Sequence, residues 1–561
     1  MKRFSLGSLV LWLATTTYLL VFLVYPILYV FVRAFIVEGR FSLAYFYIMT
    51  GDPVLRESIF NSFLISTLST ILTVLAGYAI AYVMVRFDFK LKHVFEVLLL
   101  LPFVVPPFVG AIGMIQLFAR FGAVNAFLMQ LGVISRPIDW FGNRILGIVL
   151  LEVLHLYPIA YLNIAAALSN IDPTLEESAE TLGVKGLRKF ATVTFPLSLP
   201  GVAAATAIVF IWSFTDLGTP LMFNFYKVVP VQIFHMAREI YANPMGYALT
   251  VLVLLLISII FLGIKRYTTA RSYEMLGRGH VSVRLGRMSK TAEVLVSVLL
   301  GLWVFAAALP HISVILLSFS ERWFLTVIPS RFTIEHYISI FTNDLTSISI
   351  RNSLFYSFLA TLLSLGVGLL TAYVANRGKL PQTLRDILDM LAMWPLAVPG
   401  IALAFGYLSA FSDVPLLSAY GNPTLIIIIA YATRRLPYMV RTIYAGLQQV
   451  HRSLEEAAVS LGSRPFKVVM QITIPLILAN IFAGSILVFS ECMIEVSTSL
   501  MLALREEYFP MTKAIYEVST NLAVGPELAS ALGVILMIIV SLSMIITSKL
   551  MGAKMGELFR A

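Results

Sequence analysis

The sequence predicts an all-α membrane protein that crosses the bilayer about twelve times, as two parallel six-helix repeats. Of its 561 residues, 59% are hydrophobic and only 12% are charged, whereas soluble domains carry about 25% charged residues. Apolar runs long enough to span a hydrocarbon core of about 30 Å recur along the whole chain. The predicted helices lie near 9–33, 62–85, 94–118, 145–168, 195–215 and 244–264, and again near 293–318, 353–375, 386–410, 424–447, 475–496 and 526–548.

An internal duplication accounts for the two sets of six. Segment 61–86 aligns with 352–377 without a gap, sharing Asn-Ser at the start, a central glycine, Ala-Tyr-Val and a terminal arginine. Pro158 matches Pro437 at a different separation, so the register changes in the loops, as duplication predicts. Because six is an even number, both copies have the same orientation in the membrane. We therefore predict a first repeat at 1–265, a basic linker at 266–290 and a second repeat at 291–561.

The basic residues indicate which side of the membrane each loop faces. The net charge is +10, and the lysines and arginines concentrate in loops on the side that carries Lys2 and Arg3. This is the bias of cytoplasmic loops, and it argues against a nucleic-acid-binding surface. We expect both termini in the cytoplasm and the linker 266–290 on anionic lipid headgroups. The first apolar stretch is too long for a signal peptide and is expected to remain as a transmembrane helix.

Two polar segments interrupt the apolar pattern at corresponding places; we call them the first island (172–190) and the second island (453–470). In each, a Glu–small–Ala triplet is followed by three residues and a Gly, and a Pro lies at the same distance beyond that Gly. One constant separation along the chain relates the motif residues of the first island to those of the second. The matched residues are Glu177, Ser178, Ala179, Gly183 and Pro196 for the first island, and Glu456, Ala457, Ala458, Gly462 and Pro475 for the second.

Each island is predicted to form a helix–glycine–helix elbow. Asp172-Pro173 is a helix-start signal, and the second copy is expected to start from Ser453. Gly183 and Gly462 are expected to end the first helix of each island. An ordinary capped surface loop would explain one such segment, but not two with identical spacing between corresponding helices. The islands are therefore predicted to project toward a soluble partner.

The pattern EAA-x3-G-x9-I-x-[LFI]-P resembles the EAA motif of binding-protein-dependent ABC importer permeases, here in a fused, double-length form of the type I permease fold. The resemblance implies that each island is a coupling helix docking on a separate ATPase subunit. It implies that Glu177 and Glu456 make the ion pair with that partner and that Gly183 and Gly462 form the elbow. It further implies two ATPase subunits, an extracytoplasmic substrate-binding protein and a location in the cell's inner membrane.

The chain is not expected to be an enzyme. It contains no G-x-x-x-x-G-K-[ST] phosphate loop, so ATP would be used by the partner subunits. No catalytic arrangement, bound cofactor or metal cluster is predicted, and the one cysteine, Cys492, excludes an internal disulfide.

Ionisable residues at membrane depth are candidates for the substrate pathway. Arg434 and Arg435 lie near the middle of a predicted helix, where the first repeat has His155 and Leu156. Two roles are open for the arginines: holding an anion in a cavity, or bracing the adjacent second island.

Acidic residues end two corresponding helices. Asp216 matches Glu495, and Thr219 matches Thr498. These residues could line an outer gate or attract a cation. Alternatively, they are helix-end side chains that accept hydrogen bonds from nearby loop amides.

The sequence determines the substrate less closely than it determines the class of protein. The double-length form, the RRLPY-x-VR string and the F-x-D-x-G-x-P segment resemble the ferric-iron permease group, so ferric iron is the expected substrate. Thiamine, polyamine and 2-aminoethylphosphonate permeases are similar in these features. A twelve-helix secondary transporter and a membrane scaffold remain as rival classes, although neither accounts for the repeated islands.

Overall fold

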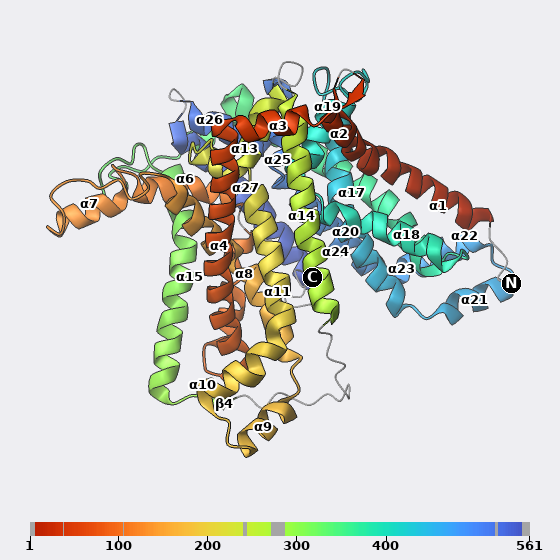
Figure 1. The fold of residues 1–561 in the computed structure, drawn as a ribbon, viewed down its shortest axis with the longest axis horizontal. Coiled ribbons are helices and arrows are strands. Elements are labelled where there is room, and N and C mark those ends of the chain that lie inside the picture. The colour runs from red at the N-terminus through yellow and green to blue at the C-terminus, as the bar shows by residue number, and fades with distance from the viewer. Residues whose placement is uncertain are drawn as a thin grey trace. The chain divides into compact units, whose positions relative to one another are not determined.

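The computed structural model describes residues 6–37, 39–104, 106–238, 244–270, 286–521 and 525–551 (Figure 1). Most of the predicted linker 266–290 therefore lies outside the described residues. The described chain is almost entirely helical. Its four strands form two small pairs, an antiparallel one of β1 (Ile36–Val37) with β2 (Arg40–Phe41) and a parallel one of β3 (Phe87–Asp88) with β4 (Gly286–Arg287).

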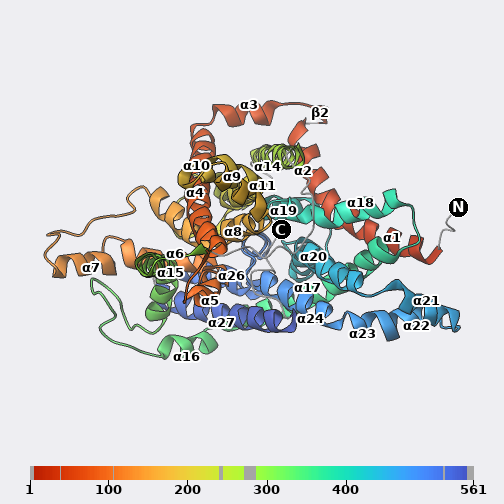
Figure 2. The same ribbon diagram turned by 90° about the horizontal axis from the view of Figure 1, so that it is seen from below.

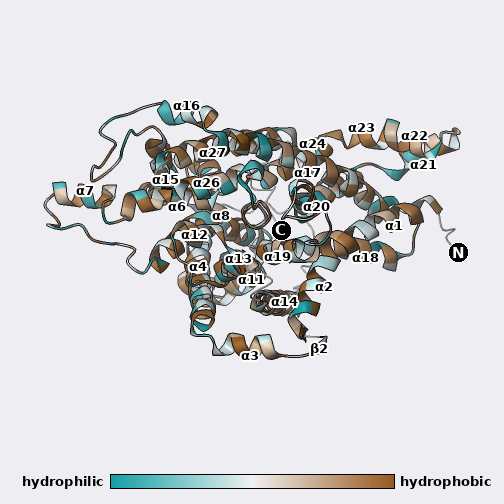
Figure 3. Cartoon of the chain, turned by 90° about the horizontal axis from the view of Figure 1, so that it is seen from above, coloured by the Kyte–Doolittle hydropathy of each residue, from teal (hydrophilic) through white to brown (hydrophobic). Residues whose placement is uncertain are grey.

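Helices of the described chain account for all of the predicted membrane spans. Among the described residues, nine helices are long and apolar enough to cross a membrane, and eleven if two bent pairs each count as one span (Figure 3). The remaining predicted span, 424–447, is helix α20 (Thr424–Gln449). It is less apolar because every 18-residue stretch of it contains Arg434, Arg435 and Arg441.

The chain divides into two compact units, which do not follow the sequence repeats. The first unit comprises Met1–Pro53, Gln232–Leu254 and Ile334–Lys554, and the second comprises Val54–Val231, Leu255–Thr333 and Met555–Ala561. Each unit thus holds the first membrane helix of one repeat together with later helices of the other. The repeats 1–265 and 291–561 describe the duplication, whereas packing groups the chain differently.

The first unit contains most of the second repeat. Its elements are α1 (Leu6–Leu19), η1 (Leu20–Val24), α2 (Tyr25–Phe35), β1, β2, α3 (Ala44–Gly51), α16 (Glu335–Thr342), α17 (Asp344–Arg377), α18 (Gln382–Met393), η4 (Trp394–Leu396), α19 (Gly400–Ala410), α20, α21 (Arg452–Ser460), α22 (Pro465–Val468), η5 (Val469–Thr473), α23 (Ile474–Leu476), α24 (Leu478–Met493), α25 (Ser497–Leu502), η6 (Glu506–Tyr508), α26 (Met511–Thr520) and α27 (Gly525–Met551). The division falls within α13 (Val229–Arg238) and α14 (Met245–Ala270).

Specific contacts attach the first membrane helix to this unit. The Trp12 indole N–H donates to the Leu384 carbonyl of α18 at 2.8 Å, and the hydroxyls of Tyr18 and Thr433 are hydrogen-bonded at 2.8 Å. Figure 2 shows α1 running beside α18. At Gly406 of α19, an added Cβ would lie 3.0 Å from the Pro26 carbonyl oxygen. The glycine is therefore what lets α2 and α19 approach closely.

The second unit contains most of the first repeat. Its elements are α4 (Pro53–Arg86), β3, α5 (Lys92–Leu98), η2 (Leu101–Val104), α6 (Pro107–Phe118), α7 (Ala123–Gln130), α8 (Ile145–Ser169), α9 (Pro173–Thr181), α10 (Gly186–Lys189), η3 (Phe190–Thr194), α11 (Phe195–Thr215), α12 (Gly218–Met222), β4 and α15 (Lys290–Ser318). Here α15, the first helix of the second repeat, packs on α6. Gly113 permits this contact, because a Cβ there would collide with the backbone of Pro310.

Prolines break the third helix of each repeat. The pair 382–396 and 400–410 is bent by 102°, with Pro395 and Pro399 at the break. In the first repeat the predicted helix 94–118 is divided into α5, η2 and α6. Because prolines lack an N–H and clash with the preceding turn, an apolar run that contains them does not continue as one helix.

A wide π-helical turn precedes three of the prolines. η1, η3 and η5 are each followed, after one residue, by Pro26, Pro196 and Pro475. Each turn closes with a bond from a backbone N–H to the carbonyl five residues earlier, such as Phe195 to Phe190. A proline ring crowds the carbonyl four residues before it, and widening the turn relieves that contact. Such turns recur at functional sites in helices.

Candidate functional site

The islands fold as the predicted elbows. In the first, the Asp172 carboxylate accepts a hydrogen bond from the Thr174 N–H at 2.9 Å and caps α9. This bond lowers the pKa of Asp172. In the second, α21 begins at Arg452 with His451 as its cap, one residue before the expected start near Ser453. The cap is the His451 ring, which bonds to the Ser453 N–H at 3.4 Å.

Both glycines end their helices in the left-handed region. Gly183 has a φ of 83° and Gly462 a φ of 86°. In the first island the Val184 N–H reaches back to the Ala179 carbonyl at 2.9 Å, and in the second the Ser463 N–H reaches Ala458 at 3.0 Å. This is the Schellman arrangement, which satisfies carbonyls at the end of a helix and favours glycine. The glycines were thus placed correctly from the sequence.

The motif residues divide between an outward and an inward face. Glu177 and Ser178 are exposed and Ala179 is half-buried, and Glu456, Ala457 and Ala458 repeat this pattern. Pro196 and Pro475 lie in the first turns of α11 and α23, where the chain continues into the next membrane helix.

Apolar side chains at matched positions also point outward from the islands. Leu182 and Leu461 are 83% and 88% exposed, and Leu187 and Phe466 are 87% and 77% exposed. Large apolar groups that are exposed at both copies of a polar segment are typical of a docking surface. Sequence reasoning did not select these residues, although the constant separation between the islands applies to them too.

The glutamate that precedes each triplet has a different environment. Glu176 Oε1 lies 2.9 Å from Nη2 of Arg86, at the end of α4, and accepts a hydrogen bond from the Thr194 hydroxyl at 2.7 Å. We call this trio the first clasp. In the second clasp, Glu455 Oε1 lies 3.5 Å from Arg377 Nε and accepts from the Thr473 hydroxyl at 2.9 Å. The sequence contained a signal, since both arginines end the aligned segments 61–86 and 352–377.

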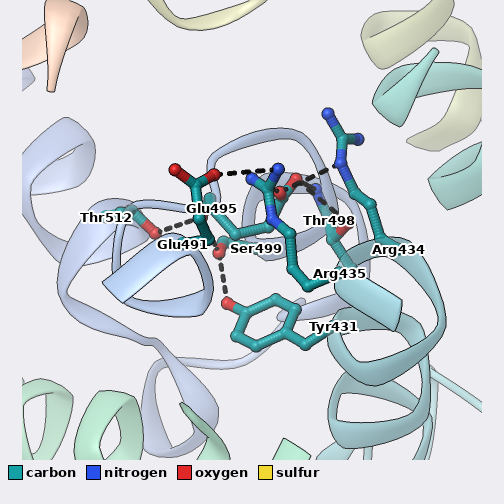
Figure 4. Close-up of polar contacts among 8 residues, drawn as sticks. All are labelled: Tyr431, Arg434, Arg435, Glu491, Glu495, Thr498, Ser499 and Thr512. Atoms are coloured by element: carbon teal, nitrogen blue, oxygen red, sulfur yellow. Dashed lines mark hydrogen bonds and ion pairs between the residues drawn. The ribbon is translucent and has the colours of Figure 1, made fainter. Parts of the chain in front are cut away.

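A charge cluster joins α20 to α24 and to the residues just after α24, inside the first unit (Figure 4). Arg435 lies between two carboxylates, with Nη1 at 3.0 Å from Glu491 and Nη2 at 2.7 Å from Glu495. Arg434 Nε lies 3.2 Å from Glu495, while its terminal nitrogens point away from the cluster. The Tyr431 hydroxyl bonds to Ser499 at 2.6 Å beside them. Two positive and two negative side chains thus balance one another at membrane depth.

Arg435 therefore contacts α24 through Glu491, and both arginines contact Glu495, two residues beyond the end of α24, rather than the second island. Glu491 was not selected from the sequence, because its position in the first repeat is Trp212 and the duplication gave no hint of an acid there. The helix that they join, α24, is the one that follows the island through η5 and α23.

The other predicted acid, Asp216, makes helix-end contacts. It accepts hydrogen bonds from the N–H groups of Gly218 at 3.0 Å and Thr219 at 3.3 Å, at the start of α12. Glu495 likewise accepts from the N–H of Thr498 at 3.3 Å, in addition to its arginine contacts. Both acids thus have the loop-amide partners of the second alternative, and a gating role remains a prediction for either.

A third acid contacts α11, the helix that ends just before Asp216, in the second unit. The buried Glu152 of α8 accepts a hydrogen bond from Ser213 of α11. Among the described residues, no three His, Cys, Asp or Glu side chains gather where they could hold a metal ion.

Two features thus define the class of protein: a duplicated bundle of membrane helices, and two elbows with exposed apolar tips. The chain belongs to the family of binding-protein-dependent transport system inner membrane components, whose sequence model matches it twice, at residues 73–272 and 364–556. It is a permease subunit, from a family whose members are non-catalytic, and a multi-pass membrane protein.

The names of individual relatives are more specific than the description of the family. The chain is 28% identical to the ferric transport system permease protein FbpB of Actinobacillus pleuropneumoniae, over 89% of this chain and 72% of that protein. It is 29% identical to the putative ferric transport system permease protein FbpB 1 of Haemophilus influenzae, over 86% and 76%. A solved bacterial ABC transporter involved in alginate import matches at 17% identity and a TM-score of 0.39, over 46% of this chain and 94% of that chain.

Proposed function

We propose that this chain forms the translocation pathway of an ATP-driven importer and couples it to two separate ATPase subunits, one on each island. The observation that carries the proposal is the duplicated elbow. One chain offers two helices that have a cap and a Schellman glycine at matched positions, and exposed apolar residues at matched positions beside them. Glu177 and Glu456 are exposed beside these residues and are available for a charge-assisted hydrogen bond with a partner.

The membrane orientation follows from the same proposal. Islands that bind ATPase subunits lie in the cytoplasm, and with them both termini, since each repeat has an even number of spans. A substrate-binding protein on the opposite side would deliver the substrate to the pathway.

Ferric iron is the proposed substrate. The names of two relatives whose similarity covers most of this chain support it. A permease that receives its substrate from a binding protein needs no strong iron site of its own, so the proposal requires no metal cluster in the chain.

The coupling role is tested at the second elbow. Gly462→Leu places a branched side chain at a φ of 86°, which favours glycine. We expect this variant to lose the ATPase subunit when the complex is purified. Gly301→Leu is the matched control, because Gly301 of α15 has a normal φ and nothing within 4 Å of an added Cβ. Full association and full transport by Gly462→Leu would refute the coupling role.

The substrate is tested by uptake. Cells that express the chain with its neighbouring transport genes should accumulate labelled ferric iron, and cells without the chain should not. Uptake of labelled thiamine, putrescine or 2-aminoethylphosphonate in place of iron would reject iron and keep the importer class.

A further inference from the structure

The two clasps bring together parts of the chain that are far apart in sequence. In the first, Arg86 and Glu176 are 90 residues apart, and Glu176 and Thr194 are 18 apart. The three side chains come from the end of α4, the first turn of α9 and the last residue of η3. One carboxylate oxygen of Glu176 thus ties an island to two membrane helices.

The second clasp repeats this arrangement in the other unit. Its glutamate and threonine keep the constant separation that relates the two islands, whereas its arginine lies at a larger separation from its counterpart. The two segments have therefore changed register since the duplication, yet the same three side chains meet. A contact that formed by chance would not be expected in both copies after such a change. Both copies therefore share the arginine–glutamate–threonine contact itself.

Each clasp is a largely buried polar attachment of its island. Neither α9 nor α21 contains a buried residue. By contrast, Arg86 and Glu176 are 10% and 15% exposed, and Arg377 and Glu455 are 8% and 16% exposed. An ion pair that is largely withdrawn from water holds its geometry better than an exposed one, because solvent competes less for either charge.

The threonine of each clasp lies at a deformable point. Thr194 and Thr473 end the π-helical turns η3 and η5, two residues before Pro196 and Pro475. The proline removes a backbone hydrogen bond there. A displacement of the island is thus carried by Glu176 or Glu455 to a place where the next membrane helix bends easily.

The second clasp also holds a further helix. Arg377 Nη2 donates to the carbonyls of Leu447 at 2.9 Å and Val450 at 2.5 Å, at the end of α20. In the same unit α20 carries Arg434 and Arg435. Arg435 pairs with Glu491 of α24, and both arginines pair with Glu495, which follows α24. The contacts of Arg377 therefore connect the second island with the charge cluster through one helix.

We infer that Arg86–Glu176–Thr194 and Arg377–Glu455–Thr473 are positioning residues that transmit movement of each island to the membrane helices. The inference rests on the proposed function, because it presumes that ATPase subunits move the islands. It assigns different tasks to adjacent glutamates: Glu177 and Glu456 face the partner, and Glu176 and Glu455 face the membrane helices.

The test uses the complete transporter with its ATPase subunits, purified and reconstituted in liposomes. Glu176→Gln and Glu455→Gln keep the size of the side chain and remove its charge. We expect ATPase association and ATP hydrolysis to stay near wild type, and substrate uptake per ATP hydrolysed to fall about tenfold, within the usual range of coupling between sites. This ratio distinguishes transmission from folding, because a misfolded protein would lose association as well.

A matched control lies on the same helix as Arg86. Glu57, near the other end of α4, pairs with Lys227 at 2.7 Å, with both side chains about half exposed. Glu57→Gln therefore also removes one ion pair from α4 and should leave the ratio unchanged. Arg86→Lys, which keeps the positive charge, should recover part of the ratio that Arg86→Gln loses.

The outcomes separate the two proposals. A wild-type ratio in both Glu176→Gln and Glu455→Gln would overturn the transmission role. So would loss of the ATPase subunit from these variants and from Thr194→Val, because the clasp would then serve docking only. If wild-type liposomes show no ATP-dependent uptake of any candidate substrate, the proposed function itself fails, whatever the clasp variants do.

Discussion

Arg435 is the side chain whose loss should damage the membrane domain most. It is 13% exposed and contacts two carboxylates, Glu491 and Glu495, which are 9% and 3% exposed. Arg435→Gln leaves Glu491 without its cation and changes the cluster from neutral to a charge of −1. Breaking a buried pair by removing one partner costs about 3–5 kcal/mol. This corresponds to about a hundredfold or more in the unfolding equilibrium.

Arg434 provides the internal comparison. Its side chain is 21% exposed and makes one contact, at 3.2 Å to Glu495, which keeps Arg435 when Arg434 is removed. Arg434→Gln should therefore cost about 1.5–3 kcal/mol, the usual contribution of a hydrogen bond to a charged group. Arg331→Gln is the exposed control, since its pair with Glu321 spans 3.7 Å with side chains 79% and 60% exposed. It should cost at most about 1 kcal/mol.

The assay is unfolding of the purified protein in one detergent, by heat and by denaturant, followed by tryptophan fluorescence. The expected order of stability is wild type, Arg331→Gln, Arg434→Gln and then Arg435→Gln. The double variant Arg435→Gln/Glu491→Gln is neutral again and should be more stable than Arg435→Gln alone. The reasoning is refuted if Arg435→Gln is no less stable than Arg331→Gln, or if the double variant is the less stable of the two.

Two further predictions concern helix packing and capping. Gly113→Ala places a Cβ against the backbone of Pro310 and should cost about 1–3 kcal/mol, whereas Gly301→Ala on α15 should not destabilise; equal melting temperatures would contradict this. The pKa of Asp172 is lowered by its bond to the Thr174 N–H, so its contribution to α9 is present above the ordinary value of 3.8 and is lost as pH falls through the lowered value. Asp172→Ala should therefore speed hydrogen exchange of the α9 amides at neutral pH, and unchanged exchange would exclude the cap as their support.

The local features of the islands were predictable because consecutive residues encode them. Asp172-Pro173 starts a helix, and Gly183 ends it in a conformation that favours glycine. The second helix starts one residue earlier than expected, because a histidine ring takes the capping position where serine is commoner. The breaks at prolines also have a local cause, because the ring itself prevents the helix from continuing.

The roles of the adjacent glutamates were not predictable. Glu176 and Glu177 are one residue apart on a short helix, so they point in directions about 100° apart. Which of them faces inward depends on Arg86, 90 residues earlier in the chain. The same holds for Arg434 and Arg435, whose partners on α24 and just after it lie about 60 residues further on.

The sequence by itself determined the membrane class, the duplication and the position and elbow geometry of both islands, because apolar length, repeat spacing, caps and glycines act within a few residues. The tertiary structure alone decided three things: that α1 packs with the second repeat and α15 with the first, that Arg435 is neutralised by Glu491 and Glu495, and that Glu176 and Glu455 hold the islands to the membrane helices. Each of these depends on which side chains and helices that are distant in sequence come into contact. No local pattern of residues specifies that choice.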